Sequence, residues 1–142
     1  MTYKEMKAKL EAIGAKRRLL GSIERQLAEP RAEADCLRGG GQGVRVSGGI
    51  KEPAAQRYVE RVDRLECRRA ELLTDLMAEE ADVETLLRAL DPVEEAIIRA
   101  RYLAGKRWRT VQREVGYERA QPFRIARRAV SKLAKLYQNP QR

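Results

Sequence analysis

The chain of 142 residues contains no histidine and only two cysteines. Histidine and closely spaced cysteines are the usual ligands of zinc, so the chain lacks the residues that a zinc site needs. Cys36 and Cys67 lie far apart and form no metal-spaced pair. A disulfide between them requires two helices that bring them together, whereas a reducing cytosol favours free thiols. We expect no metal site and no cofactor.

Aromatic residues make up 5% of the chain and charged residues 36%, and long apolar runs are missing. A membrane span needs about 20 apolar residues, and the start MTYKEMKAKLEAIG lacks the apolar core of a signal peptide. We therefore expect a soluble, intracellular protein that does not associate with a membrane.

Catalytic residues are also hard to find. No nucleophile with a neighbouring base stands out, and Glu79, Glu80, Asp82 and Glu84 fit a solvated helix face. We expect no catalytic residue, and an enzyme is the least favoured class.

Residues 39–49, GGGQGVRVSGG, hold six of the ten glycines. This composition is typical of a flexible linker. A nucleotide-binding loop would need Gly-Lys-Ser/Thr or a strand-turn-helix setting, and neither is present. The stretch therefore predicts a connection between two longer elements.

Both flanks of this connection have helical spacing. Residues 2–29 carry a heptad-like stripe, although Gly14 and Gly21 each cost about 1 kcal/mol relative to alanine, and Pro30 is a candidate end or kink. Residues 51–90 contain no glycine and repeat apolar residues every three or four positions. Two such helices predict a long antiparallel hairpin. Its leftover apolar side chains need a further partner, which is the C-terminal segment, a second copy of the chain or another protein. Self-association is expected, as a homodimer or a higher oligomer. These side chains include Leu19, Ile23, Leu73 and Leu87.

The positive charge is concentrated after residue 90. Residues 91–142 hold 13 basic and 5 acidic side chains, a net charge of +8, whereas residues 1–90 hold 17 and 16, a net charge of +1. A local positive field of this size favours a polyanionic partner.

Three short helices are predicted in this basic segment. The first begins at Asp91 and Pro92, with the Asp side chain as a cap, and ends at Gly105. The second covers 108–115 and is followed by Gly116, which can supply a positive φ. The third begins between 118 and 122 and runs to about 137. Expected inward positions are Val93, Ala96, Ile97, Ala100, Leu103, Trp108, Val111, Val115, Ile125, Ala129, Leu133 and Leu136.

Two amphipathic helices joined by a glycine turn, the second of them basic, predict a helix-turn-helix that binds double-stranded DNA. The candidates for base contacts are Arg119, Gln121, Arg124, Arg127 and Arg128. Those for phosphate contacts are Lys106, Arg107, Arg109 and Lys132. Because proline lacks an N–H donor, we expect the third helix to begin at Pro122 itself, which favours Arg124, Arg127 and Arg128 over the earlier two.

The same segment carries a family pattern. It reads Glu95-x-x-Ile98-x-x-x-Tyr102-Leu103-x-Gly105-Lys106-x-Trp108-x-x-Val111-x-x-x-Val115-Gly116-Tyr117, followed by Arg124-Ile125 and Ala129-Val130-x-Lys132-Leu133. This pattern resembles the helix-turn-helix of sigma-70 region 4, and is similar to small phage regulators of the autolysin-regulatory and late-transcription-activator type, including related phage families of unknown function. The resemblance implies a phage or prophage transcriptional regulator that associates with the nucleoid in the cytoplasm of a bacterial host, and it suggests contact with RNA polymerase.

The sequence thus predicts an all-α protein, with a hairpin over 1–90 for oligomerisation and a DNA-binding domain over 91–142. Two other functions stay open. A phage terminase small subunit also joins a helix-turn-helix to an oligomerising helical region, and a helical adaptor could use its basic end to bind an acidic protein.

Overall fold

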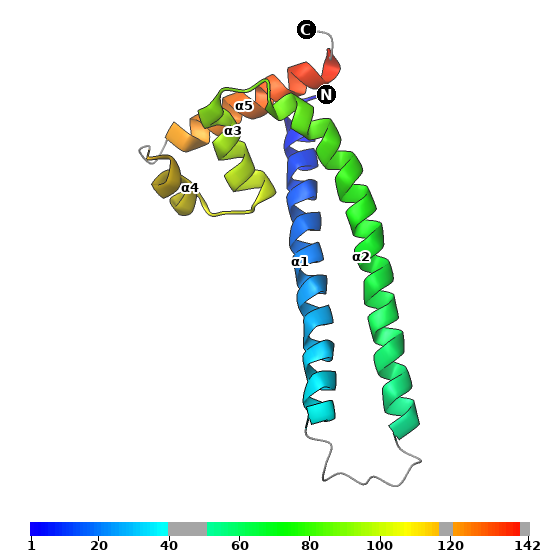
Figure 1. Ribbon diagram of the computed structural model, residues 1–142. Helices are drawn as coiled ribbons and strands as arrows, with labels where there is room; N and C mark the ends of the chain where they lie inside the picture. Colours follow the sequence, from blue (N-terminus) through cyan, green and yellow to red (C-terminus); the bar gives the residue numbers. More distant parts are fainter. Residues whose placement is uncertain (40–50, 117–120, 140–142) are drawn as a thin grey trace. The chain divides into compact units, whose positions relative to one another are not determined.

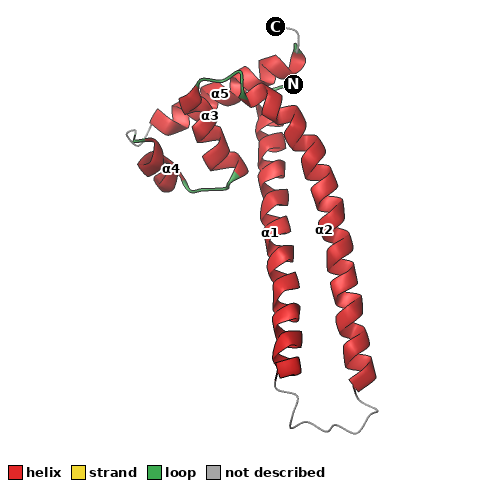
Figure 2. Cartoon of the chain, in the orientation of Figure 1, coloured by secondary structure: helices red, strands yellow, loops and turns green. Residues whose placement is uncertain are grey.

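The computed structural model describes residues 1–39, 51–116 and 121–139, with side chains described for 1–29, 54–116 and 121–139. This part of the chain is helical and contains no strand (Figures 1 and 2), which confirms the all-α class. The elements are α1 (Tyr3–Gly39), α2 (Lys51–Leu87), α3 (Pro92–Ile98), the π-helix η1 (Arg99–Leu103), α4 (Trp108–Val115) and α5 (Gln121–Gln138). Predicted residues 40–49 of the linker, and Arg119, lie outside the described residues.

Helix α1 has a defined start and continues beyond its predicted end. The Thr2 N–H donates to Glu5 Oε2 at 2.7 Å, and the Glu5 N–H donates to Thr2 Oγ1 at 3.3 Å. This reciprocal pair is a capping box, and the bond from the Thr2 backbone holds the pKa of Glu5 below its usual value. At the other end, the helical backbone passes Pro30 and reaches Gly39.

The described chain forms two compact units, each of which contains parts of α1 and α2. One unit is Leu19–Thr74, which we call the arm. Its core consists of Ile23, Leu27 and Leu72, against which Leu20, Val62 and Leu65 pack. Arg69 and Glu24 add an ion pair at 3.3 Å.

The other unit, which we call the head, combines Met1–Arg18 with Asp75–Arg142. Its core draws on every described helix, so the start of α1 and the end of α2 are built into the same interior as α3, α4 and α5. The most deeply buried side chains are Met6, Leu10, Ile13, Val83, Leu87, Ile97, Ile98, Val111, Val130 and Leu133. The boundary near residue 90 expected from the sequence stays a prediction.

Two of the four side chains expected to need a partner beyond the hairpin are buried within the chain. Ile23 belongs to the core of the arm, and Leu87 is fully buried in the head. Ile23 is covered by the other side chains of the arm core, and Leu87 lies in the interior of the head. Leu19 remains exposed and Leu73 half-buried, so only these two retain the predicted role.

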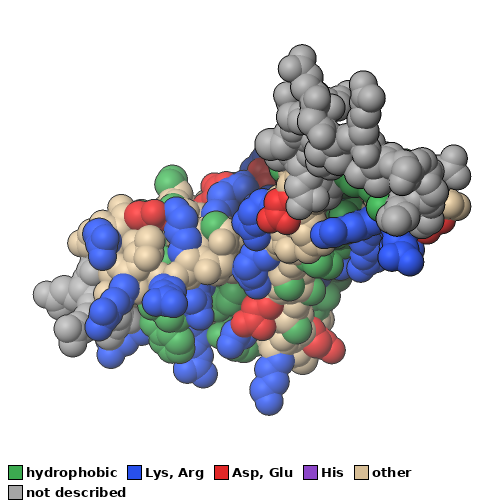
Figure 3. All heavy atoms as spheres, turned by 90° about the horizontal axis from the view of Figure 1, so that it is seen from below, with side chains coloured by type: hydrophobic (Ala, Val, Ile, Leu, Met, Phe, Trp, Pro, Cys, Tyr) green, Lys and Arg blue, Asp and Glu red, His purple; other side chains and the backbone are tan. Residues whose placement is uncertain are grey.

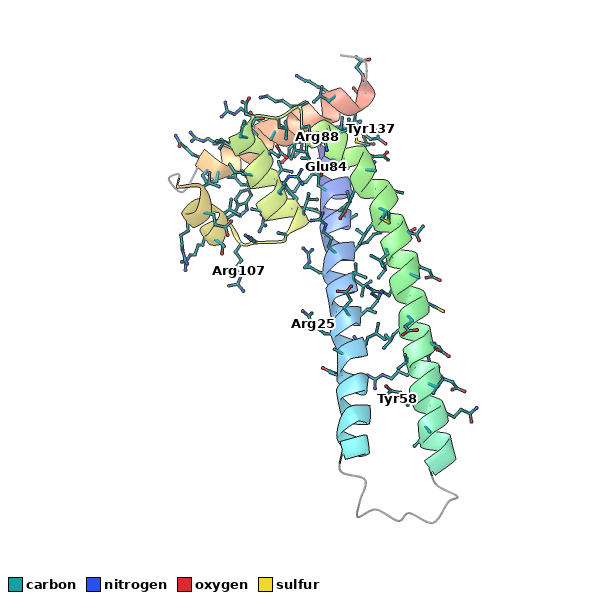
Figure 4. The ribbon with its side chains drawn as sticks, in the orientation of Figure 1. Arg25, Tyr58, Glu84, Arg88, Arg107 and Tyr137 are labelled. Carbon is teal, nitrogen blue, oxygen red and sulfur yellow. The ribbon has the colours of Figure 1, made fainter. Side chains whose placement is uncertain are left out.

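The acidic residues near the end of α2 were expected to form a solvated face, and for three of them this is wrong. Glu79 pairs with Lys16, and Glu80 pairs with Arg17, both on α1. Glu84, labelled in Figure 4, accepts a bond from Arg99 Nη2 at 2.6 Å, which holds the pKa of this carboxyl below its usual range. These ion pairs link α2 to the rest of the head, while Asp82 is exposed as expected.

A close backbone approach fixes α1 against η1. At Gly14, an added Cβ would overlap the carbonyl oxygen of Tyr102 and lie 3.2 Å from its carbonyl carbon. Only glycine leaves room for the two backbones at this distance. Gly21, in contrast, has open space where a Cβ would be.

The first helix of the basic segment differs from prediction in two details. Pro92 occupies the first turn as predicted, but Asp91 makes no side-chain cap bond. The helix widens into η1 before it ends, and Gly105 then adopts a positive φ of 70°. Val93 and Ala96 are exposed instead of buried, because the packed side of α3 is formed by Glu94, Ile97 and Ile98.

Tyr102 gives the head a predicted pH dependence. Burial raises its pKa to about 12. Because the folded state holds the phenol proton more tightly than the unfolded chain does, this stabilisation is complete below about pH 10 and is lost as the pH rises toward 12. We expect the free energy of unfolding to fall across this window, and to fall less in Tyr102→Phe. Denaturant titrations of both proteins at about pH 9 and about pH 11 measure this; equal losses would contradict it.

Candidate nucleic-acid interface

Helix α4 has sharply defined ends. Arg107 precedes it in an extended conformation, with φ −71° and ψ 152°. Gly116 closes it with φ 78°, and its N–H donates to the carbonyl of Gln112 at 2.8 Å. A left-handed conformation costs other residues about 1–2 kcal/mol, so glycine is the suitable residue here. The predicted role of Gly116 as the turn residue is confirmed.

Helix α5 begins at Gln121, one residue before the predicted start, and packs against α3 and α4. Its buried stripe consists of Pro122, Ala126, Ala129, Val130, Leu133 and Ala134. The predicted positions Ala129 and Leu133 are therefore right, whereas Ile125 and Leu136 are only half-buried. The stripe is displaced because small alanines at 126 and 134 allow close helix packing.

The opposite side of α5 presents an arginine-rich surface. Arg124, Arg127 and Arg128 are exposed, and with Gln121 and Ile125 they line an open depression of about 680 Å³. None of the three arginines forms an ion pair with an acidic side chain in the described part of the chain. Helix α5 holds five basic residues and no acidic one. The structure thus brings together four of the five predicted base-contact residues on one surface.

The four predicted phosphate-contact residues fall into two groups. Lys106 pairs with Glu114 at 2.7 Å, and Lys132 pairs with Glu94 at 2.7 Å. Arg107 and Arg109 are exposed and have no acidic partner among the described residues. Figure 4 shows the Arg107 side chain directed away from α4, so this cation is accessible from solvent.

Glu94 and Lys132 connect α3 to the basic helix. Glu94 is only 8% exposed, and its Oε2 atom is buried without a hydrogen-bond partner, whereas Oε1 accepts the bond from Lys132. This bond raises the pKa of Lys132 above its usual value. A buried carboxylate needs compensation by an opposite charge. Lys132 therefore has a positioning role in the free protein that sequence spacing did not indicate.

An aromatic and cationic stack joins η1, α4 and α5. The Trp108 ring lies 4.9 Å below the Arg101 guanidinium, and its centroid is 5.5 Å from that of Phe123, edge to face. Arg101 Nη1 also donates to the carbonyl of Lys106 at 2.9 Å. Phe123 and Arg101 were not among the predicted site residues; a phenylalanine in the first turn of a basic helix was the available signal.

Comparisons with protein-family models, with curated proteins and with solved structures gave no match. The interface is therefore assigned from its own residues. Figure 3 shows Lys and Arg side chains across the face of the molecule that it views.

Among the side chains described for 1–29, 54–116 and 121–139, no group of three His, Cys, Asp or Glu residues could hold a metal ion. In the same ranges, none of the helices has an apolar stretch sufficient to cross a bilayer. Cys67 is an exposed free thiol.

Proposed function

We propose that the chain is a sequence-specific DNA-binding regulator of transcription of phage or prophage origin. In this proposal α4, Gly116 and α5 act as a helix-turn-helix, and α5 is the recognition helix that enters the major groove. The arm and the adjoining turns of α1 and α2 form the hairpin that carries it.

The exposed arginine surface of α5 carries the proposal. Arginines on a helix surface are often paired with neighbouring carboxylates, yet Arg124, Arg127 and Arg128 have no such partner among the described residues. Their guanidinium groups remain available for bidentate bonds to guanine O6 and N7, and Gln121 can do the same for adenine. This combination suits direct readout of bases better than a merely solvated surface.

The phosphate contacts would come from α4 and its approach. Arg107 and Arg109 can meet phosphate oxygens directly because no carboxylate occupies them. Lys106 would have to leave Glu114, and Lys132 would have to leave Glu94, before either could bind a phosphate. Their net contribution to DNA affinity is therefore smaller. Such contacts orient the recognition helix without reading sequence.

Transcriptional control, and contact with RNA polymerase, are proposed from the resemblance of residues 95–133 to sigma-70 region 4. Self-association through the hairpin is proposed from exposed Leu19 and half-buried Leu73. Light scattering tests the assembly. A dimer suits a regulator, whereas a ring of many copies would favour a terminase small subunit.

DNA binding is testable without knowing the target. Selection from a pool of random duplexes should yield an enriched site, and fluorescence anisotropy should show that the full chain prefers it over a scrambled duplex. Four phosphate contacts per chain predict a slope of log affinity against log salt of about −3.6, so that raising salt from about 50 to about 200 mM weakens binding about 150-fold. No enrichment, with no duplex bound at about 50 mM salt, would reject the proposal. Capture of an acidic protein under those conditions would favour an adaptor.

A further inference from the structure

Phe123 is an exposed apolar side chain at the start of a basic helix. It lies in the first turn of α5, between Gln121 and Arg124, and 54% of its surface is open to solvent. The neighbouring exposed positions on this helix are basic or amide side chains. A large hydrophobic group at the leading turn of the proposed recognition helix therefore stands beside the groups that would read bases.

The ring is held in place from behind. Trp108, half-buried at the start of α4, contacts it edge to face with an interplanar angle of 64°. Trp108 is in turn covered by Arg101, whose guanidinium is anchored on the Lys106 carbonyl. Phe123 is thus backed by fixed groups, and the entropy lost on binding a ligand is smaller than for a freely rotating side chain.

In the major groove, the apolar group that a base presents is the methyl on C5 of a pyrimidine. We propose that Phe123 is a specificity-determining residue that contacts such a 5-methyl group next to the bases read by Arg124. The inference rests on the proposed DNA binding. Thymine and 5-methylcytosine both carry this methyl, so the chemistry is shared and the source is decided by experiment.

The test uses the full chain and the duplex enriched by selection. Each thymine is replaced in turn by uracil, which removes the methyl alone, and each cytosine in turn by 5-methylcytosine. We expect one or two positions at which uracil weakens binding about fourfold, the factor for losing one buried methyl group at about 0.8 kcal/mol. If methylation of a cytosine raises the affinity by a similar factor, and replacement of thymine by uracil changes nothing, the contact is assigned to 5-methylcytosine.

Variants connect the effect to this ring. In Phe123→Ala the methyl sensitivity should vanish, whereas Phe123→Leu, which stays apolar, should retain part of it. Val93→Ala removes an exposed apolar side chain from α3 and should leave the sensitivity unchanged. The salt slope should be the same in all three, because no charge changes. Melting curves show whether Phe123→Ala stays folded, and Phe123→Leu tests the inference if it does not.

The outcomes distinguish failure of the role of Phe123 from failure of the proposed DNA binding. Specific binding without a methyl-sensitive position overturns the role of Phe123 and leaves DNA binding intact. Methyl sensitivity that persists unchanged in Phe123→Ala overturns it equally. Absence of binding to any duplex overturns the proposed function, and the role of Phe123 with it.

Discussion

Gly14→Ala is expected to lower the free energy of unfolding by about 3 kcal/mol, the upper part of the range for overpacking a well-packed interior. The added methyl would overlap the carbonyl oxygen of Tyr102, which is backbone and cannot rotate away. Either α1 or η1 must shift, and both belong to the core of the head. Urea denaturation followed by circular dichroism measures the loss.

Gly21→Ala is the matched control. The same change is made in the same helix, but the new methyl meets nothing within 4 Å. Alanine is the better helix former, so the free energy of unfolding should rise by about 0.5–1 kcal/mol. If the two substitutions change stability alike, the backbone approach between Gly14 and Tyr102 is not a feature of the folded protein.

Arg124→Ala and Arg128→Ala are each expected to weaken binding to the selected duplex by about 1–3 kcal/mol, or about 5- to 150-fold. Each removes a guanidinium from the open surface of α5 without uncovering a buried carboxylate, so melting temperatures should hardly change. Specificity should relax at the base pair that the side chain reads. Fluorescence anisotropy with the selected duplex and its single-base variants measures both effects.

Arg25→Ala supplies the comparison for charge. Arg25, labelled in Figure 4, is exposed on α1 in the arm and has no ion pair among the described residues. Its loss removes one positive charge far along the sequence from α5, and affinity for the duplex should stay within about 0.5 kcal/mol. Full affinity in both Arg124→Ala and Arg128→Ala would rule out this surface of α5 as the recognition surface.

Local patterns predicted the helices and several of their ends. Pro92 and Gly116 were identified by conformations that proline and glycine favour within a few residues, and the structure confirms both. The exposure of Arg124, Arg127 and Arg128 follows from the helical period alone. Such features depend on neighbours in the chain, and these are visible in a sequence.

Features that depend on distant partners were not predictable. Gly14 looked like a weakness of α1, because nothing near it indicates that Tyr102 approaches. Glu84 looked solvated, because its partner Arg99 belongs to another helix. The pairing of Lys132 with buried Glu94 spans 38 residues. Because of this pairing, Lys132 is less available for a phosphate contact than its position on the helix suggests.

The buried stripe of α5 shows a subtler limit. Isoleucine at 125 is more hydrophobic than alanine at 126, so hydrophobicity alone chose the wrong one of two adjacent positions. Close packing against α3 selects small side chains as well as apolar ones. The arginine surface was still placed correctly, because a displacement by one residue leaves the far side of the helix exposed.

The head is discontinuous along the chain, since the arm is inserted between its two segments. A fragment cut at residue 90 would leave behind Met6, Leu10, Ile13, Val83 and Leu87, and would expose the apolar surface that they cover. Transplanting the basic helices into another protein therefore requires residues 1–18 and 75–142 together, joined by a short bridge. The length of the arm, in contrast, can be changed by trimming whole turns from both of its helices without touching the interior of the head.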